Sequence, residues 1–176
     1  MKKIFLVLAC MMAVVQGVGA QEYFSSASDY ARLYLGAVEP QYQLGLWHDL
    51  PYYNDHTNVY RGRVSYYGVT YDNVRLRFDQ LEQRLVVVSP VGGVFCLPEQ
   101  EFVDWFEMDG RRYVHDPEDG LRYAALLSDG SKNGIRLYHS VWKTYSGENN
   151  FGGKTSLRIL STKDHYTLVT PEGGIT

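Results

Sequence analysis

Short runs of alternating apolar and polar residues, separated by turn signals, fill most of the chain from Val59 to Val169. In Val74–Phe78, arginines separate three apolar residues, and Ile135–Val141 repeats the alternation. A period of two is typical of a strand with one buried and one exposed face. Asp109-Gly110 lies between two such runs and predicts a hairpin. These patterns constrain the chain to a mainly β fold.

The spacing of the turn signals predicts eight to ten short strands in an antiparallel meander. Such a sheet must curl, close or stack on a second sheet to bury its apolar face, so we expect a curved sheet, a barrel or a sandwich. Periodicity does not choose among these three. We expect Gly147–Gly153 to be a polar loop, with separate strands at Leu157–Ile159 and Tyr166–Val169.

Met1–Ala20 has the layout of a secretory signal peptide. Two lysines precede an apolar core, and small residues end at Ala20, after which we expect cleavage. A membrane anchor is one alternative, but the apolar core is shorter than the roughly 20 residues that a spanning helix needs. A lipoprotein signal with lipidated Cys10 is another. The chain is therefore expected to be exported, to the periplasm, the outer membrane or the outside of the cell.

Removal of the signal peptide leaves residues 21–176, a length typical of one compact domain. Within it, residues 21–58 are expected to form an N-terminal segment, with one short helix at Ser25–Leu35 and an ordered aromatic loop at Glu39–Asn58. Residues 59–176 are expected to form the antiparallel β part. No second stretch is long and apolar enough for a transmembrane anchor in the mature chain.

Net charge and cysteine content limit the partners and the disulfide bonds that are expected for this protein. Without its two signal lysines the chain carries a formal net charge of −5, which disfavours nucleic acid as a partner. Cys96 remains as the single cysteine, so no intramolecular disulfide is expected. Its apolar neighbours indicate a buried thiol rather than a reactive one.

The sequence contains no recognisable catalytic, metal-binding or cofactor motif. The five histidines are scattered singly, and the polar run His115–Asp119 is read first as a turn. His139 is expected to be a hydrogen-bonded core residue. Asp104 with Glu107, or Glu99 with Glu101, are conceivable paired carboxylates, although sequence spacing does not give their separation. We predict no catalytic residue, metal or cofactor, and a non-enzymatic role is favoured.

Aromatic residues around the predicted loop are the best binding candidates. They are Trp47, Tyr52, Tyr53 and Tyr60, whose rings suit stacking on a sugar or a peptide. The same rings are also suited to capping the open end of a barrel, and the sequence leaves both roles open.

The segment Tyr60–Asp79 carries a resemblance to a known group of proteins. It contains the pattern G-x-V-x-Y-x-G-x-x-Y-x-N-V-x-L-x-F-D and is followed by the Leu85–Val88 strand. This resembles small exported β-rich proteins of unknown function from Bacteroidetes-type Gram-negative bacteria, and Phe106–Tyr113 and Lys163–Tyr166 resemble their later hairpins. The resemblance implies a β fold in the cell envelope and carries over no catalytic residue.

Three functions follow as hypotheses. The leading one is a non-catalytic binding or structural domain of the envelope, whose partner is an envelope protein, a glycan or a lipid. The second is a hydrolase of envelope polymers that uses acids such as Asp104 or Glu107. The third is a periplasmic lipid carrier with an apolar concave surface.

Overall fold

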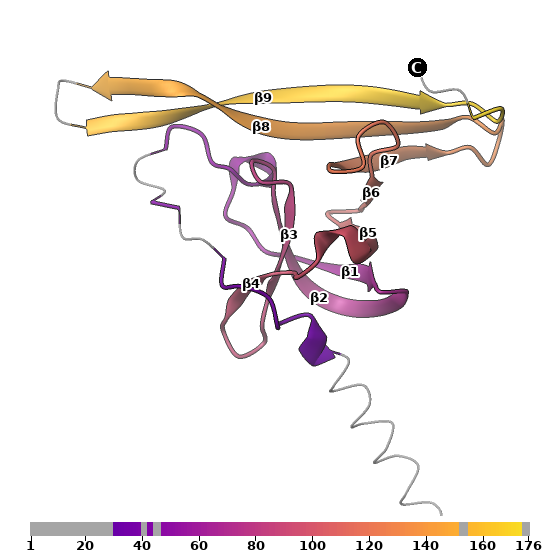
Figure 1. Ribbon diagram of the computed structural model, residues 1–176, viewed down its shortest axis with the longest axis horizontal. Coiled ribbons are helices and arrows are strands. Elements are labelled where there is room, and N and C mark those ends of the chain that lie inside the picture. Colours follow the sequence, from indigo (N-terminus) through magenta and orange to yellow (C-terminus); the bar gives the residue numbers. More distant parts are fainter. Residues whose placement is uncertain (1–29, 40–41, 44–46, 152–154, 174–176) are drawn as a thin grey trace, which may run out of the picture.

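The computed structural model describes residues 30–39, 42–43, 47–151 and 155–173. The predicted signal peptide lies outside the described residues. The described chain forms nine strands and two short 3-10 helices (Figure 1). Their bounds are η2 Tyr53–Asp55, β1 Tyr60–Tyr66, β2 Val69–Asp79, β3 Arg84–Val88, β4 Val94–Cys96, η3 Gln100–Phe102, β5 Val103–Met108, β6 Arg111–His115, β7 Tyr123–Asp129, β8 Arg136–Phe151 and β9 Thr155–Val169.

All nine strands belong to one antiparallel sheet in the order β4-β3-β2-β1-β5-β6-β7-β8-β9. The sheet curls into a half-barrel, so the predicted mainly β fold is confirmed, and the curved sheet is the form it takes. β4 and β9 are its two edge strands. Within the described residues, no helix has the length and apolar character needed to cross a bilayer.

Two-residue turns with positive φ close the tightest hairpins. Asp109 and Gly110 have φ angles of 53° and 71° between β5 and β6. Tyr67 and Gly68, at 52° and 71°, do the same between β1 and β2. Positive φ at both central positions matches the right-handed twist of the flanking strands. The hairpin predicted at Asp109-Gly110 is therefore confirmed.

The main hydrophobic core fills the enclosed face of the half-barrel. Adjacent strands bring its residues into register, as in the pairs Phe78–Leu85 and Phe106–Tyr113. The rings of Phe106 and Tyr113 stack at 4.8 Å, and Tyr123 packs edge-on to Phe106 at 5.1 Å. Buried aromatic side chains thus occupy the concave surface that a lipid carrier would need to keep open.

The described part of the predicted N-terminal helix is a single turn. Tyr30–Arg32 is helical, and Leu33 and Tyr34 donate backbone hydrogen bonds to carbonyls three residues earlier. Leu33 is fully buried in the main core. Residues 25–29 of this prediction lie outside the described residues.

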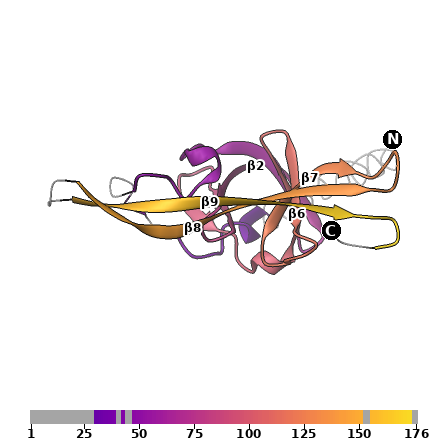
Figure 2. The same cartoon turned by 90° about the horizontal axis from the view of Figure 1, so that it is seen from above.

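The hairpin of β8 and β9 is much longer than the sequence indicated. It lies across the half-barrel and extends past it at one end (Figures 1 and 2). Residues 147–151 were expected in a polar loop but belong to β8, and the two strands expected after them are one continuous β9.

Both faces of β8 are covered near its start. Tyr138 and Ser140, on the expected polar face, are 6% and 1% exposed, and Ser140 donates a hydrogen bond to Asp116. His139, on the other face, is half-buried beside Asp164 and stacks on Tyr166 at 4.3 Å. The expectation that one face of this strand is solvated was therefore wrong, because the turn after β6 folds over it.

Lys143 of β8 anchors the long hairpin to the N-terminal segment. The side chain is buried, and its ammonium donates hydrogen bonds to the carbonyls of Leu50, at 2.6 Å, and Tyr52, at 3.0 Å. It also pairs with the carboxylate of Asp55. The Lys143 backbone N–H donates to the Gln80 carbonyl at 2.9 Å. One residue thus joins β8 to residues 50–55 and to the turn between β2 and β3.

Replacing Lys143 with methionine should lower the free energy of unfolding by about 2–4 kcal/mol, because it leaves buried acceptors without their donor. The measurement is equilibrium urea unfolding followed by circular dichroism. Lys163→Met is the matched control, since Lys163 is an exposed lysine of the same hairpin, and it should change stability by less than about 0.5 kcal/mol. Equal losses in the two variants would contradict an anchoring role for Lys143.

Candidate functional site

The N-terminal segment crosses between the two edges of the half-barrel. At one edge, Glu39 N–H donates to the Val94 carbonyl and Cys96 N–H to the Ala37 carbonyl, which pairs the segment with β4. At the other edge, Trp47 bridges to Arg158 of β9. We call the described residues 37–39, 42–43 and 47–48 the strap. It ties together the two edges that the curled sheet leaves unpaired.

An aromatic group at the centre of the strap holds it against the sheet. The Tyr42 hydroxyl donates a 2.7 Å hydrogen bond to Asp79, which is 1% exposed. The Tyr42 ring packs edge-on against Trp47 at 5.6 Å and against Tyr52 at 5.8 Å. Burial raises the pKa of Asp79, and the hydrogen bonds from Tyr42 and from backbone N–H groups oppose that shift.

A buried ion pair holds the strap next to β4. Glu39 is 8% exposed and accepts a 2.9 Å hydrogen bond from Arg77, whose guanidinium lies 4.9 Å from the centre of the Tyr52 ring. Burial raises the pKa of Glu39 more than Arg77 and the Tyr52 hydroxyl lower it. The alternation in β2 had suggested that Arg77 is on a solvated face, whereas the strap covers it.

An open cleft, the Trp47 cleft, lies between the strap and the projecting half of the β8–β9 hairpin. Its volume is about 340 Å³, and it is lined by Trp47, Tyr145, Glu148 and Arg158. Tyr145 is 53% exposed. The Arg158 guanidinium lies 5.3 Å from the centre of the Trp47 ring, and Glu148 interacts with the Tyr145 hydroxyl. Two aromatic rings therefore border the cleft beside one acid and one base.

A second cleft, the Glu39 cleft, lies on the other side of Tyr42 from Trp47. Its volume is about 480 Å³. Its described lining comes from the strap, from β2, and from the turn into β4: Val38, Glu39, Tyr42, Tyr52, Arg77, Gly92, Gly93 and Val94.

The four aromatic residues predicted to bind are not gathered at one site. Tyr52 and Tyr53 are 3% and 7% exposed, and Tyr53 packs against Tyr60 and Tyr113. Tyr60 is half-buried at the start of β1 against the main core. Trp47 alone of the four borders the Trp47 cleft, whereas Tyr52 borders the Glu39 cleft. Ligand binding by these residues stays a prediction, and Trp47 is the member best placed for it.

The sequence did not single out Tyr145, Glu148 and Arg158. Tyr145 and Glu148 lie where β8 was expected to have ended, and Arg158 lies in what was expected to be a short strand. Recognising one long hairpin would have placed Glu148 opposite Arg158, which are cross-strand partners. The sequence signal was therefore the length of the hairpin and not any local motif.

The conceivable catalytic acids of β5 belong to separate polar networks. Glu107 accepts hydrogen bonds from Arg63 at 3.4 Å and from Arg112 at 2.8 Å, whereas Asp104 accepts from Ser65 at 2.7 Å. Glu107 lines a cleft of about 350 Å³ that Asp104 does not line. The structure therefore does not bring the two carboxylates together.

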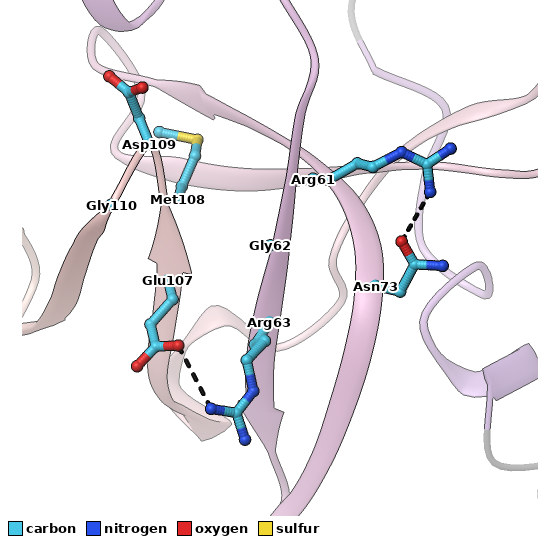
Figure 3. Close-up of a pocket in the computed structure, with 8 residues that line it drawn as sticks. All are labelled: Arg61, Gly62, Arg63, Asn73, Glu107, Met108, Asp109 and Gly110. Atoms are coloured by element: carbon cyan, nitrogen blue, oxygen red, sulfur yellow. Dashed lines mark hydrogen bonds and ion pairs between the residues drawn. The ribbon is translucent and has the colours of Figure 1, made fainter.

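In the cleft beside Glu107, the charged groups are already engaged. Figure 3 shows Arg63 reaching Glu107 while Arg61 turns aside to Asn73, at 2.6 Å. Gly62 lines this cleft because β1 and β5 approach closely there: a Cβ would lie 1.9 Å from the Glu107 carbonyl oxygen. The described lining of this cleft has no aromatic side chain, whereas two border the Trp47 cleft, which is therefore the stronger candidate site.

The polar run after β6 is a turn, as the sequence indicated. Asp116 is 2% exposed, and it accepts hydrogen bonds from the Glu118 N–H at 2.9 Å and from Ser140. His165 of β9 lies 2.8 Å from Glu118. Among the residues that the structure describes, no group of three or more histidine, cysteine or acidic side chains is placed to hold a metal ion.

Cys96, the last residue of β4, is buried, with 8% of its surface exposed. Burial raises the pKa of its thiol, which favours the unreactive protonated form. The interpretation of this residue as a small buried side chain is confirmed.

Comparison of the chain with models of protein families, with curated proteins and with solved structures found no match. The functional argument therefore rests on the residues and geometry of the two clefts.

Replacing Glu39 with glutamine should change how stability depends on pH. A raised pKa means that the folded protein binds this proton more readily than the unfolded chain. The wild type should therefore gain stability relative to Glu39→Gln as pH falls from neutral through the raised pKa. The gain should end below the ordinary pKa of a glutamate.

Urea unfolding of both proteins over a pH series measures this difference. Glu101→Gln, at an exposed glutamate, is the control and should show no such pH-dependent gain. A wild type that instead loses stability relative to Glu39→Gln on acidification would show that pairing with Arg77 outweighs burial.

Proposed function

We propose that this protein is an exported binding domain of the cell envelope that holds a glycan in the Trp47 cleft. The observation that carries the proposal is the meeting of Trp47 with the exposed ring of Tyr145, beside Arg158 and Glu148. Aromatic faces pack against the apolar C–H faces of sugar rings, and charged side chains hydrogen-bond to sugar hydroxyls. Export is supported by the signal-like Met1–Ala20 segment.

The construction of the cleft also supports a binding role. Lys143 fixes the hairpin and Tyr42 fixes Trp47, so the two sides of the cleft are positioned by separate buried contacts. A side chain held in place loses little conformational entropy when a ligand binds, which favours affinity. Tyr145 is more than half exposed, so folding gains less from its ring than from a buried one.

Replacing Trp47 or Tyr145 with alanine should weaken glycan binding by at least about tenfold, because central aromatic contacts dominate small interfaces. Isothermal titration calorimetry with a panel of soluble oligosaccharides built from glucose, mannose or N-acetylglucosamine measures the effect. At least one oligosaccharide of the panel should bind the wild type.

Two matched variants control for general loss of an aromatic side chain. Trp142 is half-buried with Arg122 over its ring, as Trp47 is with Arg158, and Tyr166 has the same 53% exposure as Tyr145. Trp142→Ala and Tyr166→Ala should retain wild-type affinity. The proposal is wrong if no oligosaccharide binds, or if the controls weaken binding as much as Trp47→Ala.

A further inference from the structure

The Trp47 cleft and the Glu39 cleft are neighbours. Tyr42 lies between them, with its ring in contact with Trp47 on one side and with Tyr52 on the other. Trp47 lines the first cleft, and Tyr42 and Tyr52 line the second. Two successive ring contacts therefore connect the clefts, a short enough span for one extended ligand to occupy both.

The Glu39 cleft contains an incompletely satisfied ion pair. Glu39 and Arg77 share one hydrogen bond, from an Nη of Arg77 to Glu39 Oε2. Glu39 Oε1 and Arg77 Nε are buried and have no hydrogen-bond partner. Buried polar atoms are nearly always paired in native proteins, so these two unpaired atoms need an explanation. The Tyr52 hydroxyl also acts on Glu39, so what the pair still lacks is a donor at Glu39 Oε1 itself and an acceptor at Arg77 Nε.

We propose that the Glu39 cleft binds the acetamido group of an N-acetylated sugar, next to the sugar held in the Trp47 cleft. The inference rests on the proposed function and narrows its ligand to an N-acetylated oligosaccharide. An acetamido group offers an N–H for Glu39 Oε1 and a carbonyl oxygen for Arg77 Nε. Both residues line the cleft, and binding requires their side chains to rotate, because the two atoms are buried in the structure.

The side chains around the Glu39–Arg77 ion pair suit the methyl end of the acetamido group. Val38, 66% exposed, and the half-buried Tyr42 line the same cleft and offer apolar contact to the acetyl methyl. The Arg77 guanidinium lies 4.9 Å from the centre of the Tyr52 ring, so its charge remains next to the cleft. A hydroxyl at the same sugar position places its donor and its acceptor on one oxygen, whereas the amide places them on two separate atoms.

The test compares N-acetylglucosamine oligomers with glucose oligomers of matched length by calorimetry on the full exported protein. The N-acetylated series should bind about tenfold tighter, the effect of one or two additional hydrogen bonds. Affinity in that series should rise from the single sugar to the length that occupies both clefts and then level off. Glu39→Gln should reduce the preference between the series, because a neutral amide oxygen replaces the charged acceptor, whereas Glu101→Gln should retain it in full.

A second measurement needs no variant and covers the case in which Glu39→Gln fails to fold. In nuclear magnetic resonance spectra of the wild type, the Arg77 Nε–H signal should shift on addition of an N-acetylglucosamine oligomer. It should shift much less with the matched glucose oligomer.

The outcomes separate this inference from the proposed function. Equal affinity for the two series, with both weakened by Trp47→Ala, would overturn the acetamido site and leave glycan binding at Trp47 intact. Absence of binding to either series would overturn both. A preference that is unchanged in Glu39→Gln, or an Arg77 signal that does not respond, would also overturn the acetamido site.

Discussion

The buried ammonium of Lys143 is the interaction on which the arrangement of this protein most depends. A half-barrel leaves the outer edge of β9 without a neighbouring strand, and here β8 and β9 are the longest strands in the sheet. Three acceptors from residues 50–55 surround the charge. A buried charge is costly unless it is paired. Lys143 can therefore stay buried only while residues 50–55 supply its acceptors, and these residues are in turn held in place by the hairpin.

The strap is held at the opposite edge of the sheet, beside β4, by buried polar groups that are likewise paired. Glu39 and Asp79 are buried carboxyl groups with raised pKa values, and Arg77 and Tyr42 hold them. Apolar residues of similar volume often stabilise a fold as well as buried ion pairs do. Departures from the most stable local choice concentrate at functional sites. The polar centre under the strap therefore points to the two clefts that it borders.

The strands, their antiparallel pairing and several turns could be predicted from the sequence because each is a local pattern, whereas the position of β1 between β2 and β5 could not. Val74–Phe78 and Asp109-Gly110 show periodicity and turn chemistry within a few residues. The length of β8 could not be predicted, since Gly147 and its polar neighbours lack alternation and extend a hairpin that is exposed. The pairing of Lys143 with Asp55 and of Glu39 with Arg77 joins distant segments, so local patterns carry no sign of it. For the same reason, Trp47 was identified and its partners Tyr145 and Arg158 were not.

Native-state hydrogen exchange tests the coupling through Lys143 most directly. The Lys143 amide donates to Gln80 and the Asp55 amide donates to Tyr52, so each reports on one side of the anchor. If the anchor joins hairpin and N-terminal segment, both amides should open in one cooperative unit, with the same opening free energy and the same dependence on denaturant. An Asp55 amide that opens at markedly lower free energy while the Lys143 amide stays protected would contradict the account.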